Sequence, residues 1–390
     1  MTFLWATIFV LGVLVFVHEL GHFIAARSVG IRVERFSIGF PPRFISITSI
    51  SYGWNIRFYF YKNVGGKLIW SPVYEKQIKR QERIASGTEY VLALIPLGGY
   101  VKMAGMIDES LDNQITDAPD EFMSKPTWAK YWVLSAGVIM NLITAFIIFS
   151  GISYVQGTAE IVDEPVVSEL RPDMPAHEAG VLPGDRIIAI DGSKINTWEE
   201  LTNKIHKIPN TPITLTIDRN KIKFDISLIT TSMIIPNSDN EMDTLGMIGI
   251  VPEIIYSDIL FGDALISGFG ATLNSVGMII MSIKMLTKGV ASVSDLGGPI
   301  MIAQLAGQTA NEGWIPLLSF MALISVNLAF LNILPIPGLD GGHIFILLIE
   351  SFIRRPLTLK SRIVIQQIGM TFLLLLMVTV VYNDISRLFN

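Results

Sequence analysis

The sequence predicts a polytopic α-helical membrane protein with about four transmembrane helices, a membrane-re-entrant β-hairpin and an inserted β-rich soluble domain. Three observations support this fold class. The chain of 390 residues is 51% hydrophobic and only 16% charged, with a mean hydropathy of +0.51, which is too apolar for an ordinary soluble protein. Long apolar runs recur along it. Between residues 157 and 256, by contrast, charge density is ordinary and turn signals separate short strand-like runs.

Composition also excludes several classes of site and partner. There is no cysteine, so the chain has neither disulfides nor thiolate metal ligands, and any metal must be held by histidine and carboxylate. The formal net charge is -5, which gives no basic face for nucleic acid. We therefore expect no nucleic-acid partner.

The first predicted span, residues 1–27, contains the sequence His18-Glu19-Leu20-Gly21-His22 near its end. The apolar run before this motif lacks the basic start and the small-residue cleavage site of a signal peptide, so we expect it to be retained. Ionisable residues at membrane depth usually mark a functional site. Histidines four apart on a helix can bind one Zn²⁺, and Glu19 would then lie beside the metal as a general base. The motif occurs by chance in other helices and supplies only two of the three ligands that a catalytic zinc needs.

Basic residues directly after the first span place that end in the cytoplasm and the N-terminus outside. They are Arg27, Arg32, Arg35 and Arg43. Residues 28–130 are then a cytoplasmic, β-rich region. Within it, residues 90–106 form two apolar runs joined by Gly98 and Gly99, a pattern that predicts a β-hairpin. A hairpin at membrane depth must lie against protein or a water-filled cavity.

The second predicted span covers residues 131–155 and returns the chain to the outside. Its one strongly polar residue is Asn141. Such a residue is either an interhelical hydrogen-bonding group or part of a catalytic site, and the first interpretation is favoured.

Residues 157–256 form the inserted domain. The stretch from Met174 to Leu201 resembles a PDZ domain, with Gly184-Asp185 before a strand and Asp191-Gly192 at a hairpin turn. PDZ domains bind extended peptides by adding a strand to a sheet edge. We therefore expect this domain either to bind a peptide or to act as a size filter.

Residues 257–314 are predicted to be juxtamembrane helices, although Ala264–Ile283 carries no charge and is apolar enough to be a span. The third span, residues 315–353, must break at Pro335 and Pro337, because proline cannot continue a helix. Such breaks survive in a membrane only where they line a cavity or a site. The fourth span, residues 363–383, leaves the C-terminus outside.

The third metal ligand must come from elsewhere in the chain. Ionisable candidates at membrane depth include Asp340, His343, Asp263 and Lys284, of which a protonated lysine is a poor ligand. If the first and third spans both enter from outside, His18 and Asp340 lie near the same cytoplasmic side. This condition requires that Ala264–Ile283 does not cross the membrane, so we expect that segment to lie on the membrane surface.

Nearly the whole chain resembles the bacterial site-2 proteases of the RseP type, which are intramembrane zinc metalloproteases. The motifs are HELGH at 18–22, RVERFSIGF at 32–40, GTEYVLALIPLGGYVKM at 87–103, the PDZ segment, GGPI at 297–300 and SVNLAFLNILPIPGLDGGH at 325–343. The resemblance implies that His18, His22 and Asp340 bind Zn²⁺ and that Glu19 is the general base.

The resemblance also implies a set of substrate contacts. Asn332 would contact the substrate backbone, and the re-entrant hairpin would pair with an extended substrate strand. The hairpin residues expected to do so are Gly98, Gly99, Tyr100 and Val101, and Pro335 and Pro337 are further expected contacts. Two features depart from the family: there is room for about one PDZ domain where the best-known members have two, and the segment 45–86 is longer than the resemblance predicts.

The expected function is hydrolysis of a peptide bond within the transmembrane segment of a single-span membrane protein that another protease has already cut. Anti-sigma factors and signal-peptide remnants are the usual substrates of the family. The expected location is the bacterial inner membrane. The alternatives are a membrane metal transporter, which the soluble domain argues against, and an inactive PDZ-bearing adaptor, which would have no use for Glu19 beside a metal.

Overall fold

A computed structural model describes residues 2–64, 67–80, 85–106, 116, 118–236, 242–290, 292 and 297–389. The chain divides into two compact units. Residues 1–152 and 265–390 form the first, which we call the helical unit, and residues 153–264 form the second, which we call the inserted unit. Each is described by itself.

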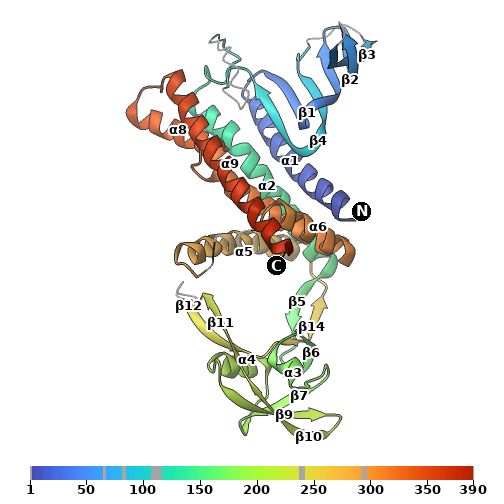
Figure 1. Cartoon of the computed structure of the whole chain (residues 1–390), viewed down its shortest axis with the longest axis vertical. Helices are drawn as coiled ribbons and strands as arrows, with labels where there is room; N and C mark the ends of the chain where they lie inside the picture. Colours follow the sequence, from blue (N-terminus) through green and yellow to red (C-terminus); the bar gives the residue numbers. More distant parts are fainter. Residues whose placement is uncertain are drawn as a thin grey trace. The chain divides into compact units, whose positions relative to one another are not determined.

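Long apolar helices dominate the helical unit (Figure 1). They are α1 (Thr2–Ser28), α2 (Thr127–Gln156), α5 (Phe261–Thr287), α6 (Pro299–Glu312), α7 (Trp314–Ile333), α8 (Asp340–Ile353) and α9 (Leu359–Phe389). Among the described residues, 5 helices are long and apolar enough to cross a membrane: α1, α2, α5, α7 and α9. Apolar side chains remain exposed all along them. This is expected of helices whose surroundings are lipid.

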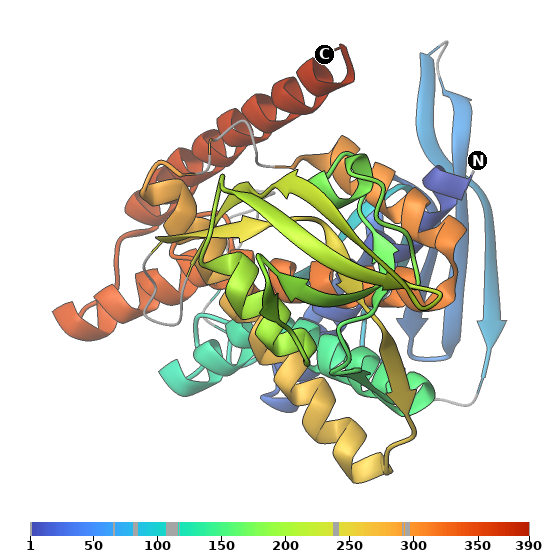
Figure 2. The ribbon, with the colours of Figure 1, turned by 90° about the horizontal axis from the view of Figure 1, so that it is seen from below.

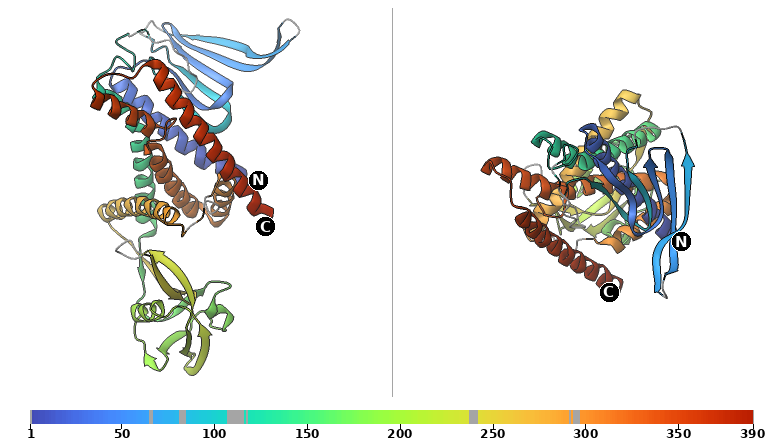
Figure 3. Two further views of the ribbon diagram at one scale, coloured as in Figure 1. Left: turned by 60° about the vertical axis from the view of Figure 1, so that its left-hand side comes forward. Right: turned by 90° about the horizontal axis from the view of Figure 1, so that it is seen from above.

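Helix α5 is the segment that the sequence left ambiguous. It meets the length and hydropathy requirements of a span. Yet it runs across α2 instead of alongside it (Figures 1 and 3). Its contact face is made of small and polar residues: a side-chain carbon on Gly268 would lie 2.1 Å from Oγ of Ser150, and Thr272 and Ser275 are buried. A helix that crosses its neighbours in this way suits a membrane surface, and the four-span topology stays a prediction.

The N-terminal ends of α1 and α7 lie side by side. The rings of Trp5 and Trp314 have centroids 6.0 Å apart, and Phe9 packs edge-on against Trp314 at 6.2 Å. At the other end of α1, the indole N–H of Trp132 in α2 donates to Oγ of Ser28 at 3.1 Å. Helices α1 and α7 therefore run in the same direction and α2 runs against them, as the shared depth of His18 and Asp340 requires.

A four-stranded sheet with the order β3-β2-β1-β4 completes the helical unit. Its strands are β1 (Val33–Ile50), β2 (Gly53–Val64), β3 (Lys67–Lys79) and β4 (Glu89–Met103). Strands β1 and β4 pack along α1 (Figure 1), whereas the β2–β3 hairpin extends away from the helices (Figures 2 and 3). The prediction of a β-rich region between the first two spans is therefore confirmed.

The predicted hairpin at residues 90–106 is wrong in its pairing. The two arms of the predicted hairpin do not pair with each other. Instead, the segment 35–38 of β1 lies between them and pairs on one side with residues 89–92 and on the other side with residues 99–102. In the first pairing the numbers of the paired residues rise together, and in the second they run in opposite directions. The chain reverses before the glycines, and Gly98 and Gly99 lie within β4 itself. Neighbouring backbone is close here: a side-chain carbon on Gly99 would lie 2.7 Å from the carbonyl oxygen of Ser37. Glycine at this position therefore allows two strands to approach closely, and it does not form a turn.

The predicted break between α7 and α8 is confirmed. Helix α7 ends at Ile333 and α8 begins at Asp340, with Gly338 at a φ of 100° in the connection. The glycines that follow are needed because carbonyl groups pack onto them: a side-chain carbon on Gly341 would lie 2.3 Å from the carbonyl oxygen of Ile333. The break therefore places Asp340 at the first residue of a helix, where the helix dipole favours a carboxylate.

The GGPI segment begins α6 and is held by α9. The buried carboxylate of Asp384 accepts hydrogen bonds from the backbone N–H groups of Gly298, Ile300 and Met301, at 2.9, 2.9 and 3.2 Å. The first N–H groups of a helix have no acceptor within the helix, so they need one from elsewhere in the chain. The C-terminal end of α9 is thereby fixed to α6 (Figure 3).

The inserted unit is β-rich, as predicted. Its strands are β5 (Thr158–Ile161), β6 (Val167–Leu170), β7 (Arg186–Ile190), β8 (Ser193–Lys194), β9 (Pro212–Arg219), β10 (Ile222–Ile229), β11 (Thr231–Pro236), β12 (Met242–Met247), β13 (Ile250–Pro252) and β14 (Ile254–Ser257). Two short helices, α3 (Pro175–Glu178) and α4 (Trp198–His206), pack with the sheet β10-β9-β7-β8 around an aliphatic core.

The PDZ-like motifs have the predicted local structure. Asp191 and Gly192, with φ of 49° and 75°, make the two-residue turn between β7 and β8, a geometry that Asp-Gly favours. Asp185 is buried directly before β7. Its carboxylate accepts hydrogen bonds from Nε and Nη2 of Arg219, at 2.7 and 2.8 Å.

Candidate metal centre

Three predicted ligands converge in the helical unit. His18 and His22 lie one turn apart on α1, with their Nε2 atoms 3.2 Å apart. Oδ2 of Asp340, at the start of α8, lies 3.2 Å from each of these nitrogens. All three side chains are largely shielded from solvent. Of the described residues, these three are the group of histidines and carboxylates able to hold a metal ion.

This triangle fits Zn²⁺. Tetrahedral zinc with bonds of about 2.0–2.1 Å has ligand atoms about 3.3–3.4 Å apart, close to the three edges found here. The buried Oδ2 atom of Asp340 has no hydrogen-bond donor of acceptable geometry within the described residues, although two imidazole nitrogens lie beside it. Two imidazoles and one carboxylate are also the donor set of many catalytic zinc sites.

The second nitrogen of His22 has a defined partner. Its Nδ1 atom lies 2.8 Å from the carbonyl oxygen of Val133 in α2, to which it donates. A histidine that donates from Nδ1 presents the lone pair of Nε2, so this contact directs Nε2 towards Asp340 and His18. The other histidine meets Asn141, whose amide Nδ2 lies 3.3 Å from Nδ1 of His18.

Gly137 of α2 provides the space for the two imidazoles. A side-chain carbon at this position would lie 2.5 Å from Nε2 of His22 and 2.6 Å from Cε1 of His18. Such distances are far below van der Waals contact. The absence of a side chain at residue 137 is therefore a requirement of the site that the sequence alone did not reveal.

Glu19 lies against β4. A side-chain carbon on Gly99 would be 3.3 Å from Cγ of Glu19, so the backbone of β4 passes directly by the candidate base. Tyr100 and Val101 continue this strand; the Tyr100 hydroxyl accepts from Nη1 of Arg35 at 3.3 Å, and Val101 is buried. The strand predicted to pair with the substrate therefore lies beside the predicted base.

The remaining predicted contacts lie at the helix break. Asn332 is half-buried in the last turn of α7, and Pro335 and Pro337 lie in the connection to α8. Within the described residues, no hydrogen bond or ion pair joins Asn332 to the three converging side chains. Its predicted role with the substrate is therefore not tested by these contacts.

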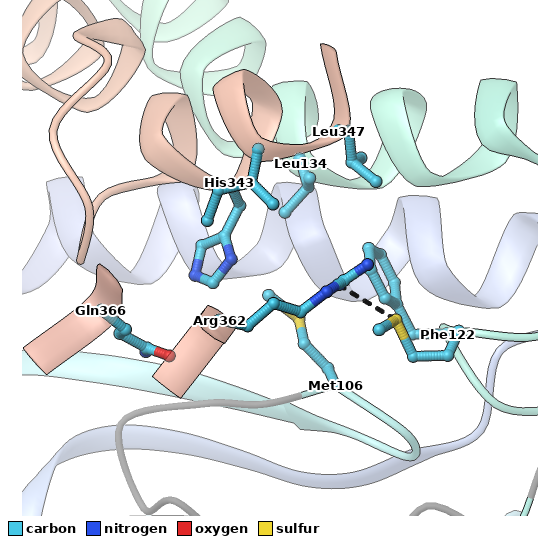
Figure 4. A pocket seen from close by; sticks show the side chains of 9 residues that line it. Met106, Phe122, Leu134, His343, Leu347, Arg362 and Gln366 are labelled. Carbon is cyan, nitrogen blue, oxygen red and sulfur yellow. Dashed lines mark hydrogen bonds between the residues drawn. The ribbon is translucent and has the colours of Figure 1, made fainter. Parts of the chain in front are cut away.

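His343, an alternative third ligand, points elsewhere. It lines a cavity of about 30 Å³ together with Arg362 and Gln366 (Figure 4). Arg362 binds both carboxylate oxygens of Glu350, at 2.5 and 2.6 Å, and its Nη1 contacts Sδ of Met123. This cavity is large enough for about one water molecule. Between the two candidates on α8, the geometry therefore favours Asp340.

Comparison with known protein sequences gives matches over nearly the whole chain. The model of the family described as Peptidase family M50 matches residues 6–71 and 76–376. A protein of Agrobacterium fabrum, whose name assigns it provisionally to the zinc metalloproteases, is 33% identical over 397 residues, covering 98% of this chain and 95% of its own. The protein named zinc metalloprotease RasP from Bacillus licheniformis is 29% identical over 462 residues, covering 98% of this chain and 99% of its own.

A solved structure is similar to part of the chain. A PDZ domain of an SdrC-like protein from Listeria monocytogenes is 19% identical and covers 24% of this chain and 90% of its own, with a TM-score of 0.19. The PDZ-like description of the inserted unit rests on its own motifs and strands.

Proposed function

Because this chain belongs to peptidase family M50, the site-2 protease family, we propose that it is a zinc metalloprotease that cuts a peptide bond within the transmembrane segment of another protein. The observation that carries the proposal is the triangle of His18, His22 and Asp340 beside Glu19, in a unit built from apolar helices. Ionisable residues among such helices mark a functional site, so the bond that this site would hydrolyse would itself lie in the membrane.

In this mechanism His18, His22 and Asp340 would hold a zinc ion, which would supply Lewis acidity towards the scissile carbonyl. Glu19 accepts the proton of the attacking water and delivers it to the nitrogen of the leaving amine, so that one carboxylate serves both steps. Asp340 lies at the N-terminal end of α8, where the helix dipole is favourable to a carboxylate.

The substrate would bind as an extended strand. A transmembrane helix uses its carbonyl groups in internal hydrogen bonds, so it must unwind before any carbonyl can react. Strand β4 is the terminal strand of its sheet, and at Gly99 it lies beside Glu19. Adding a substrate strand to this edge would satisfy the unwound backbone and hold it at the site. Tyr100 and Val101 would continue that pairing, and Asn332, Pro335 and Pro337 would contact the substrate from the helix break.

The substrate class that we propose is a single-span membrane protein already shortened by a first cut. The PDZ-like inserted unit would bind a peptide of this substrate or exclude uncut ones by size. We further propose that the protein resides in the bacterial inner membrane with both termini outside, following the basic residues after the first span.

The test uses purified full-length protein in detergent with a single-span substrate. Chelation should abolish cleavage, addition of Zn²⁺ should restore it, and mass spectrometry should place the cut inside the hydrophobic segment. Zinc flux into vesicles without cleavage would instead indicate a transporter. Substrate binding without cleavage, in the presence of zinc, would indicate an adaptor, and either result would overturn the proposal.

A further inference from the structure

We infer that Asn141 is a positioning residue of the metal centre: its amide oxygen accepts the Nδ1–H of His18 and so directs Nε2 of His18 towards the metal. The inference rests on the proposed function, since it presupposes that His18 is a zinc ligand. The sequence favours an interhelical hydrogen-bonding role for Asn141. The contacts assign it two roles, one for the backbone and one for the side chain.

The side chain of Asn141 lies at the site and is fully buried. Nδ2 of its amide is 3.3 Å from Nδ1 of His18, and its Oδ1 atom has no hydrogen-bond partner in the part of the chain that the structure describes. The oxygen and nitrogen of such an amide exchange places by a half-turn about the terminal bond. Either group can therefore occupy the position that faces His18.

The proton on His18 decides between the two orientations. If Nε2 of His18 gives its lone pair to a metal, the neutral imidazole carries its proton on Nδ1, and Nδ1 is a donor. An amide NH₂ at 3.3 Å would then place two donors opposite each other. The amide oxygen in that place makes a hydrogen bond instead. Metal ligation by His18 therefore requires the orientation in which Oδ1 of Asn141 faces the ring.

The same helix orients the other histidine. Nδ1 of His22 donates to the carbonyl oxygen of Val133, which lies eight positions before Asn141 on α2, with Gly137 halfway between. Residues four apart lie on one face of a helix. One stripe of α2 thus provides an acceptor for His22, space for both imidazoles and an acceptor for His18. Such outer hydrogen bonds fix the tautomer and the orientation of metal-bound histidines.

The interhelical role belongs to the backbone of the same residue. Oγ of the buried Ser325 in α7 donates to the backbone carbonyl oxygen of Asn141 at 2.8 Å. This bond holds α2 against α7 without involving the amide. Loss of the Ser325 hydroxyl therefore tests helix packing at this point, and a change of the Asn141 side chain tests the metal centre.

The experiment compares the zinc affinity of the full-length protein in detergent with that of three variants, by competition with a chromogenic chelator. Asn141→Leu removes the acceptor at similar volume, and we expect zinc affinity to fall about 10–100-fold, the usual effect of losing such a partner. Asn141→Asp keeps an acceptor at the same place and should bind zinc within about threefold of wild type. Ser325→Ala should lower the unfolding temperature of the metal-free protein and leave zinc affinity within the same limit.

A second readout comes from Co²⁺ in place of zinc. The visible absorption of bound Co²⁺ reports ligand geometry, so Asn141→Leu should change the spectrum while Ser325→Ala should not. Equal zinc affinity in wild type and Asn141→Leu overturns the inference, as does an equal loss in Asn141→Leu and Asn141→Asp. If Asn141→Leu does not fold, Asn141→Ala takes its place, because it also removes the acceptor: a loss of about 10-fold or more in Asn141→Ala with retained affinity in Asn141→Asp supports the inference, and unchanged affinity in Asn141→Ala contradicts it.

The two proposals fail in different ways. Wild-type protein that binds no zinc, or binds it equally well after His18→Ala, contradicts the proposed function itself. Wild-type protein that binds zinc through His18 but is indifferent to residue 141 contradicts only the inference about Asn141.

Discussion

Nε2 of His22 lies 3.2 Å from Oδ2 of Asp340. This contact links α1, the first helix of the chain, to α8, the helix that begins after the break at Pro335 and Pro337. The two residues are separated by most of the sequence, including the whole inserted unit. The proposed site therefore exists only when α1 and α8 are packed in the same unit, and a metal bound there would stabilise that packing.

Asp340→Asn should abolish zinc binding. The amide oxygen is a neutral and weaker ligand than the carboxylate, so we expect zinc affinity to fall by more than about 100-fold, beyond the usual effect of an outer partner. The unfolding temperature should then no longer rise with added zinc. Chelator competition and thermal unfolding measure both effects. His343→Gln is the control on the same helix, and zinc loss in that variant with retention in Asp340→Asn would reverse the ligand assignment.

Gly137→Ala should disrupt the site through steric overlap. The added methyl group would lie 2.5 Å from Nε2 of His22, so at least one imidazole must move and zinc affinity should fall by about 10-fold or more. Gly151→Ala is the matched control on the same helix, because a side-chain carbon there meets nothing within 4 Å. It should bind zinc normally and gain up to about 1 kcal/mol of helix stability. Equal zinc affinity in both variants would contradict the geometry.

Gly99→Ala should separate metal binding from cleavage. Its methyl group would lie 2.7 Å from the carbonyl oxygen of Ser37 and 3.3 Å from Cγ of Glu19. The strand and the base must shift while the metal ligands stay in place. We expect cleavage to fall about 10-fold or more, since small misplacements near a reacting bond cost up to about 100-fold, with zinc affinity unchanged. Gly12→Ala in α1, where nothing lies within 4 Å, should leave both unchanged. Normal cleavage by the Gly99 variant would exclude β4 from the site.

The inserted unit should lose stability in acid through Asp185. Burial alone would raise the pKa of this carboxyl, but hydrogen bonds from Arg219 and from the backbone N–H of Leu182 outweigh it, and the pKa is lowered. A lowered folded-state pKa means that the stabilisation is complete above the unfolded value of about 3.9 and is lost as pH falls through the lower folded value. The free energy of opening of β7 and β9 in the full chain, obtained from hydrogen exchange after correction for the pH dependence of the intrinsic exchange rate, should therefore stay constant between neutral pH and about 5 and fall below about 4.

Asp185→Asn provides the control for this effect. It weakens the contacts with Arg219 and should destabilise the inserted unit by about 1.5–3 kcal/mol at neutral pH, the usual value for a hydrogen bond to a charged group. The acid-dependent loss of opening free energy in β7 and β9 should shrink in the variant. An unchanged pH profile would show that other carboxyl groups control the acid response.

Much of this architecture is predictable from the sequence, because its signals are local. Uninterrupted apolar runs predict α1, α2, α7 and α9, and Pro335 with Pro337 predicts where the third span breaks. The place of Asp340 near His18 follows from counting membrane crossings. The histidine pair follows from helical spacing alone.

The rest depends on contacts between distant segments. The two apolar runs around Gly98 look like a hairpin because no local signal reveals that a segment of β1 lies between them. A strand partner is chosen by the tertiary structure. Likewise, the sequence of α2 does not show which of its faces contacts α1. The sequence therefore indicates no role for Gly137 and favours a helix-packing role for Asn141. One residue on α2 can serve both roles because its backbone and side chain meet different helices.

The most direct test of the central claim is cleavage of a single-span substrate by wild-type protein and by Glu19→Gln, with zinc content measured in both. The account predicts that the variant keeps its zinc and cleaves about 10²–10⁴-fold more slowly, the usual contribution of a general base. Equal cleavage by the two proteins, or wild-type cleavage that persists after zinc has been removed, would contradict it.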